Sequence, residues 1–177
     1  MYKLSKEEEF IKNFTDSIYD TDRIVIPKLN EFKINETKII EGTIVSLESM
    51  WIRLNQNIQT LIQEFDTVSG FDLIVNSKKG KRAIANRVCW ETDWNTFTIR
   101  KSVASGYETE IDKRMRETEE DYLSPHWTVQ TYISQRRTGN LMSMGICKTK
   151  DLMRYIKEEN AEDSVQKKDP WFCSQFT

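Results

Sequence analysis

Histidine, cysteine and proline are scarce in this 177-residue sequence, which contains one, three and three of them. The cysteines, Cys89, Cys147 and Cys173, form no CxxC pair, and a single histidine does not complete a zinc site of Cys/His type. We expect each cysteine to behave as a small buried apolar residue. The sequence contains neither the GxSxG motif of serine hydrolases nor a GxxxxGK[ST] phosphate loop. We therefore interpret His126 as a structural hydrogen-bonding group.

Long apolar runs are also missing, so we expect no membrane span. The first ten residues, MYKLSKEEEF, lack the basic and apolar regions of a secretory signal. Apolar residues make up 38% and charged residues 31%, which is typical of a soluble globular protein. We expect a cytoplasmic location, and the cytoplasm of a phage-infected bacterium would fit. Because the net charge is −2, any contact with nucleic acid requires a local basic patch.

The first half of the chain contains two helical patterns. Ser5 and Glu8 have the spacing of a capping box, and the apolar residues that follow predict a helix over 5–20. Residues 23–34 are ambiguous, and residues 24–26 could form a short edge strand, because the proline that follows cannot donate to a central ladder. A 3/4 alternation of apolar residues over 44–65 predicts a long amphipathic helix from about residue 43. This helix either packs on a sheet or forms a coiled-coil seam that would make a homodimer.

The second half alternates between strand and helix patterns. A Lys/Gly turn and an Asp-Trp-Asn turn separate three predicted strands, at 71–76, 82–90 and 96–101. A helix over 107–120, strands over 126–134 and 140–147 and a last helix over 149–160 follow.

This order of elements predicts an α/β (α+β) fold in a single domain over residues 1–160. We expect a central mixed β-sheet that contains a three-strand antiparallel meander and is flanked by helices. Residues 161–177 are predicted to form a polar, flexible tail.

Acidic residues cluster before and at the start of the first meander strand, at Glu64, Asp66 and Asp72. Cationic residues follow on the next strands. Carboxylates and cations at the edge of a small sheet suit metal-assisted phosphodiester chemistry, although an ordinary charged sheet rim has the same composition. The meander with its leading carboxylate resembles the PD-(D/E)xK phosphodiesterase superfamily over residues 64–120.

This resemblance implies a restriction-endonuclease-like fold and a Mg²⁺ ion held by Asp72 with Glu64 or Asp66. The metal would polarise a DNA phosphate and activate water. Where the family has an acidic-x-Lys triplet, this chain has Ala-Asn-Arg at 85–87, so Arg87 stands in the position of the lysine. Glu91 would have to replace the missing acidic residue. The implied catalytic set is Asp72, Arg87 and Glu91.

Three interpretations of Asp72 remain open. It is a metal ligand in a working nuclease, a remnant in a fold that now binds without cutting, or a solvated carboxylate at a strand edge. In the second case the protein would bind nucleic acid or a protein partner, for example as a phage-encoded accessory or anti-defence factor.

Six cations are candidate contacts to a nucleic-acid backbone: Lys78, Lys79, Lys81, Arg82, Arg100 and Lys101. The first four lie in a predicted hairpin turn, where a solvated loop tip is the alternative. Ion pairs with nearby carboxylates are the alternative for Arg87 and Arg100. A second pair, at 136–137, lies in a later turn and allows the same two interpretations. If both turns lie on one side of the sheet, they form a single patch.

Overall fold

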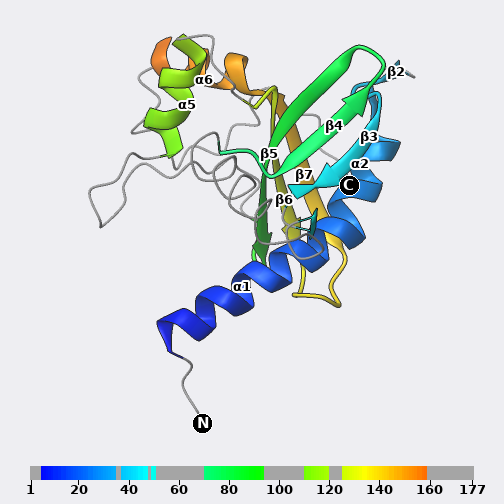
Figure 1. Ribbon diagram of the computed structural model, residues 1–177. Helices are drawn as coiled ribbons and strands as arrows, with labels where there is room; N and C mark the ends of the chain where they lie inside the picture. Colours follow the sequence, from blue (N-terminus) through cyan, green and yellow to red (C-terminus); the bar gives the residue numbers. More distant parts are fainter. Residues whose placement is uncertain are drawn as a thin grey trace.

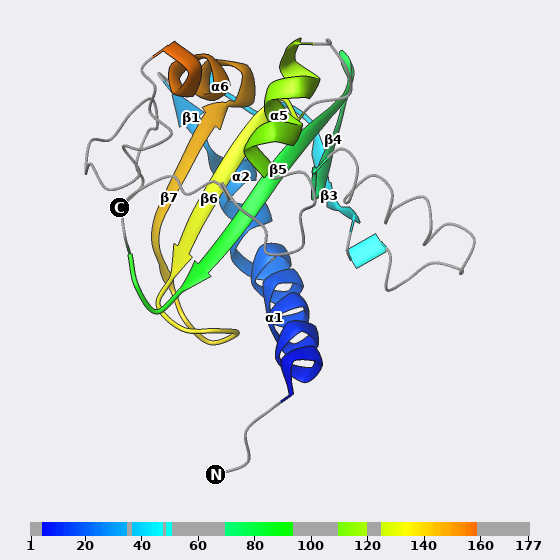
Figure 2. The ribbon, with the colours of Figure 1, turned by 90° about the vertical axis from the view of Figure 1, so that its left-hand side faces the viewer.

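The computed structural model describes residues 5–34, 37–47, 49–50, 70–93, 110–119 and 125–158. They form one small α+β domain around a five-stranded mixed sheet in the order β3-β4-β5-β6-β7. In Figure 1, α2 lies on the right of the sheet and α5 and α6 lie on its left. The view in Figure 2, turned by 90°, has α5 in front of the sheet and α2 behind it. The predicted fold class is therefore confirmed.

Three helical segments follow one another at the N-terminus. Helix α1 (Lys6–Asp20) begins at the expected capping box, because Ser5 and Glu8 each accept a hydrogen bond from the other's backbone N–H group. A π-helical turn, η1 (Thr21–Val25), leads into α2 (Ile26–Glu31). The prediction of an edge strand at 24–26 is wrong, because these residues lie in η1 and at the start of α2. Proline is tolerated in the first turn of a helix, where its missing N–H group would have no helical partner.

Strands β3 (Thr43–Ser46), β4 (Leu73–Ser77) and β5 (Gly80–Trp90) pair antiparallel, so the described three-stranded group contains β3 in addition to two strands of the predicted meander. The two strands predicted at 71–76 and 82–90, and the Lys/Gly turn between them, are confirmed as β4 and β5. The prediction of a helix from residue 43 is wrong at its start. Residues 43–46 form strand β3, and their side chains alternate between the two faces of the sheet. The remainder of that helix from residue 51, and the strand predicted at 96–101, lie outside the described residues.

Gly42 makes the close pairing of β3 with β4 possible. Its φ angle is +141°, and a Cβ atom at this position would lie 2.3 Å from the carbonyl oxygen of Asn76. Any other residue would force the two strands apart.

The remaining elements agree with the sequence patterns within a few residues. Helix α5 (Glu110–Glu119) connects β5 to β6 (Trp127–Ile133), which runs parallel to β5. Strand β7 (Leu141–Lys148) is antiparallel to β6, and α6 (Thr149–Glu158) follows. A short ribbon of β1 (Lys33–Ile34) and β2 (Thr37–Lys38) precedes the sheet. The predicted tail lies outside the described residues, among which no helix is long and apolar enough to cross a membrane.

The two faces of the sheet differ in composition. The face under α2 forms the main apolar core, in which Leu29 of α2 packs with Leu73, Ile84 and Val129 of the sheet. Each of these four side chains has no exposed surface. On the face under α5, β6 instead presents buried polar side chains, at Thr128, Gln130 and Tyr132. Arg114 of α5 donates to the Thr128 hydroxyl at 3.0 Å, and the Gln130 amide nitrogen lies 2.6 Å from the Tyr132 hydroxyl.

Candidate functional site

Asp72 lies directly before β4, where the pairing of β4 with β5 ends. Its backbone N–H donates to the Ile84 carbonyl at 3.0 Å, and its carboxylate accepts a hydrogen bond from the backbone N–H of Asn86 at 2.5 Å. The carboxylate thus replaces the backbone acceptor that a longer β4 would have supplied. Asp72 is half-buried, so it is not a carboxylate in open water.

The structure separates the other predicted catalytic residues. Arg87 is half-buried on β5, next to the Asn86 amide that Asp72 binds. Glu91 is exposed beyond the far end of β5, with a φ angle of 71°. Five residues of extended strand at roughly 3.3 Å each place it about 16 Å along the chain from Asn86. Glu91 is therefore not brought to Asp72, while Glu64 and Asp66 lie outside the described residues.

We tested whether these residues fit a magnesium ion. Mg²⁺ takes six oxygen ligands and is usually held by one or two carboxylates together with waters and substrate phosphates. The described part of the chain contains no group of three or more His, Cys, Asp or Glu residues that could hold a metal. Asp72 is the one predicted ligand within it, and one of its oxygens already binds Asn86. The described residues therefore supply one predicted carboxylate for Mg²⁺, Asp72, and no larger cluster of ligands.

The first four predicted phosphate contacts lie together on the β4–β5 hairpin. Lys78 and Lys79 form its turn, and Lys81 and Arg82 follow Gly80 at the start of β5. Because neighbouring strand residues alternate, Lys81 and Arg82 point to opposite faces of the sheet. All four are exposed. Arg100 and Lys101 lie outside the described residues.

A pocket with a volume of about 190 Å³ lies beside the turn end of this hairpin. Ile40 and Val75, which are almost fully buried, are among its lining residues. The nine residues that line it come from residues 38–41, both strands of the hairpin and the start of β6: Lys38, Ile39, Ile40, Glu41, Val75, Ser77, Lys79, Arg82 and Trp127.

The charges around this pocket are unbalanced. Three cations and one carboxylate line it, which gives a net charge of +2. Lys79 lies 3.5 Å from Glu41, but both side chains are largely exposed, so the pair is weak. Among the described residues, no ion pair joins Lys38 or Arg82 to a carboxylate. Within the part of the chain that the structure describes, Lys38 and Arg82 therefore present positive charge that no carboxylate neutralises.

His126 lies beside Arg82, at the start of β6. Its backbone N–H donates to the Ala83 carbonyl at 2.8 Å, and its Nδ1 atom lies 3.5 Å from the Ala83 nitrogen. Burial and the positive charge of Arg82 lower the pKa of His126. The lowered pKa keeps the imidazole neutral at physiological pH, and these contacts suit the structural role predicted for it.

The second pair of arginines, Arg136 and Arg137, lies in the β6–β7 turn at the opposite end of the sheet. Because β5 and β6 are parallel, the turn before β5 and the turn after β6 cannot share an end. Figure 2 shows the β4–β5 turn at the top and the β6–β7 turn at the bottom. The two turns therefore do not form one patch.

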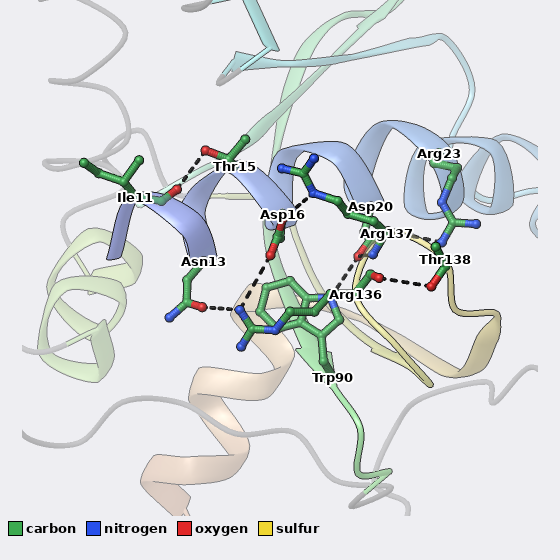
Figure 3. Close-up of polar contacts among 10 residues, drawn as sticks. All are labelled: Ile11, Asn13, Thr15, Asp16, Asp20, Arg23, Trp90, Arg136, Arg137 and Thr138. Carbon is green, nitrogen blue, oxygen red and sulfur yellow. Dashed lines mark hydrogen bonds and ion pairs between the residues drawn. The ribbon is translucent and has the colours of Figure 1, made fainter. Parts of the chain in front are cut away.

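Two buried carboxylates of α1 bind the β6–β7 turn (Figure 3). Asp16 forms ion pairs with Arg137 and, at 3.7 Å, with Arg136. Asp20 accepts hydrogen bonds from the Trp90 indole at 2.9 Å and from the Arg137 backbone N–H at 3.0 Å. Asp16 is 2% exposed and Asp20 is fully buried.

Two further contacts complete this network. The Arg136 guanidinium lies 4.4 Å from the centre of the Trp90 ring and donates to the Asn13 side chain. Arg23 forms an ion pair with Asp20 at 3.1 Å and donates to the Gly139 carbonyl at 2.6 Å. The arginines at this end of the sheet are therefore held in a structural network that joins the hairpin to the N-terminal helices.

Cys89 is the cysteine nearest to a predicted site residue. It is half-buried on β5, and burial raises the pKa of its thiol despite the opposing charge of Arg87. A raised pKa disfavours the reactive thiolate. Cys147 is buried as predicted, whereas Cys173 lies outside the described residues.

Sequence reasoning missed several residues of these two regions. Among them are Lys38 at the pocket and Asp16 and Asp20 in the arginine network. The spacing of the two aspartates by four residues places them on one face of a helix, and this was the one available signal. No local pattern indicates that Lys38 lies beside the hairpin.

No model of a known protein family matches the chain, and no curated protein or solved structure matches it. The chemistry of the site is therefore inferred from its own residues.

Proposed function

We propose that the protein binds nucleic acid through the β4–β5 hairpin and the pocket beside its turn end. The observation that carries this proposal is the net charge of +2 around the pocket, where Lys38 and Arg82 have no carboxylate partner among the described residues. Cations of this kind replace the counterions of a phosphate backbone, and the release of those counterions favours binding.

The contrast with the β6–β7 turn supports this choice of surface. Arg136 and Arg137 already share the two carboxylates Asp16 and Asp20. A phosphate that approached them would compete with buried ion pairs. In the described ranges, the ion pair of the hairpin cations is the one between Lys79 and the exposed Glu41.

Contacts from this surface are expected to be mainly to phosphates. Lys78 and Lys81 extend the charge beyond the pocket, and both are exposed on a narrow hairpin. Phosphate contacts position a protein on nucleic acid, whereas base contacts specify the sequence. We therefore expect strong dependence on salt and little dependence on sequence. Because the whole chain has a net charge of −2, this patch also fixes the orientation of binding.

Cleavage of DNA with Mg²⁺ remains a separate prediction, because Glu64 and Asp66 lie outside the described residues. A phage-type accessory or anti-defence role, a protein partner and a homodimer through residues 44–65 also remain predictions. Incubation of plasmid with Mg²⁺, with and without Asp72→Asn, tests the cleavage prediction directly.

A matched pair of double variants tests the binding proposal. Lys79→Ala with Arg82→Ala removes two pocket cations, and Lys12→Ala with Arg154→Ala removes the same residue types from exposed positions of α1 and α6. Fluorescence anisotropy with short single-stranded and double-stranded oligonucleotides at low salt measures affinity. We expect a loss of about tenfold or more for the pocket variant and of less than about twofold for the control. Equal losses, or no binding by the unsubstituted protein, would overturn the proposal.

A further inference from the structure

The pocket beside the turn end of the hairpin points to a phosphate monoester, the group found at the end of a phosphorylated polynucleotide. We propose that it binds this terminal phosphate in preference to the phosphodiesters within the chain. This inference rests on the proposed nucleic-acid binding and adds the part of the ligand that the pocket selects.

The first argument is charge. A phosphate monoester carries about −1.5 to −2 charges at pH 7, because its second pKa is near 6. An internal phosphodiester carries a single negative charge. The lining of the pocket, at +2, matches the monoester.

The second argument is size and shape. Pockets that enclose a drug-sized ligand have volumes of roughly 300–1,000 Å³, whereas this pocket measures about 190 Å³. It therefore accommodates a small group such as a phosphate and not a whole nucleotide. Its walls come from residues 38–41, from both strands of the hairpin and from Trp127. A recess bounded in this way admits the end of a chain, whereas an internal phosphate has an ester link on each side.

The third argument is the chemistry of the donors. The planar guanidinium of Arg82 can donate two parallel hydrogen bonds to phosphate oxygens, and Lys38 supplies a point charge. Neither donor has an ion-pair partner among the described residues. Ile39, Ile40 and Val75 line the same space without adding charge, so the charge of the lining comes from its cations and Glu41.

The test compares four ligands at pH 7.5 and low salt. Three are oligonucleotides of one sequence that carry a 5′-phosphate, a 3′-phosphate or hydroxyl groups at both ends. The fourth is a nucleoside monophosphate, used as a competitor. We expect one of the phosphorylated oligonucleotides to bind about tenfold tighter than the hydroxyl-ended one, and the monophosphate to compete weakly.

Two variants of the hairpin give the matched control. Arg82→Ala is expected to abolish the preference for the phosphorylated end. Lys81→Ala removes a neighbouring cation that points to the other face of the sheet, so it should weaken all three oligonucleotides equally and leave the preference intact.

The possible failures are distinguishable. Equal affinity for phosphorylated and hydroxyl-ended oligonucleotides would overturn the terminal-phosphate inference and leave nucleic-acid binding standing. A nucleoside monophosphate that binds as tightly as the phosphorylated oligonucleotide would overturn the assignment to a chain end. Absence of binding to all three oligonucleotides would overturn the proposed function itself.

Discussion

The two ends of the sheet present similar clusters of cations that differ in their partners. At the β6–β7 turn, Arg136 and Arg137 meet the buried carboxylates Asp16 and Asp20. At the β4–β5 hairpin, Arg82 and the nearby Lys38 meet no carboxylate among the described residues. A cluster of cations in the sequence is therefore available to a ligand only where the fold does not already neutralise it.

The difference has an energetic consequence. A buried carboxylate is costly unless it is paired and hydrogen-bonded, so the arginines around Asp16 and Asp20 are needed by the fold itself. The exposed hairpin cations contribute little to folding. Substitutions at the two ends should thus affect different properties, stability at one end and binding at the other.

The largest effect is expected from Asp20→Ala. This change leaves the Trp90 indole N–H and the Arg137 backbone N–H without their acceptor in a partly buried place. The free energy of unfolding should fall by about 2–4 kcal/mol, as measured by urea denaturation. Asp151→Ala, which removes an exposed carboxylate from α6, should cost less than about 1 kcal/mol. Similar losses for the two variants would contradict the structural role of the network.

The second expected effect concerns salt. If binding at Lys38, Lys79 and Arg82 releases about three counterions from the nucleic acid, log K should fall against log salt concentration with a slope of roughly −3. Removal of Lys79 and Arg82 should make the slope shallower by about 2. Arg136→Ala should leave it unchanged, because that guanidinium is already bound by Asp16. Anisotropy titrations at several salt concentrations measure all three slopes. A changed slope for Arg136→Ala would contradict the proposed difference between the two ends of the sheet.

A smaller effect, in the opposite direction, is expected from Glu41→Gln. Glu41 is the one carboxylate that lines the pocket, and it lies 3.5 Å from Lys79. Its neutralisation raises the charge of the lining and frees Lys79, so affinity for the phosphorylated oligonucleotide should increase by about threefold to tenfold. Glu31→Gln, an exposed change in α2, serves as the control. Weaker binding by Glu41→Gln would show that the carboxylate contributes to the affinity for the phosphorylated oligonucleotide, contrary to this prediction.

The smallest effect concerns His126, the single histidine of the chain. Burial and Arg82 lower its pKa, so the unfolded chain binds the proton more tightly than the folded protein. The resulting contribution to stability is present above about pH 6.5 and is lost as the pH falls below that value. Arg82→Ala should raise the pKa of His126, which a proton NMR titration measures without ambiguity. An unchanged pKa would mean that the charge of Arg82 does not affect the imidazole of His126.

Much of the fold could be predicted because its signals are local. The capping box at Ser5, the Lys/Gly turn and the alternation in β6 and β7 each lie within a few neighbouring residues. The strand at 43–46 was missed because Ile44 and Leu47 also satisfy a helical spacing. Residues 24–26 were assigned to a strand because the tolerance of proline in a first helical turn was not considered.

The candidate site was less predictable for the opposite reason. The hairpin cations are adjacent in sequence and were found, but the partners that decide their role are distant. Asp16 and Arg137 are 121 residues apart, so no local pattern in the sequence connects them. The predicted role of Glu91 requires its carboxylate to lie near Asp72. Strand β5 is continuous over 11 residues, so it carries Glu91 away from that position.

The most direct test compares one arginine from each end. Arg82→Ala and Arg136→Ala remove the same group, and circular dichroism establishes that both variants are folded at the temperature of the assay. Affinity for one 5′-phosphorylated or 3′-phosphorylated oligonucleotide at low salt is then measured for each. The account predicts a loss of about fivefold or more for Arg82→Ala and of less than about twofold for Arg136→Ala. Equal losses, or a larger loss for Arg136→Ala, would contradict it.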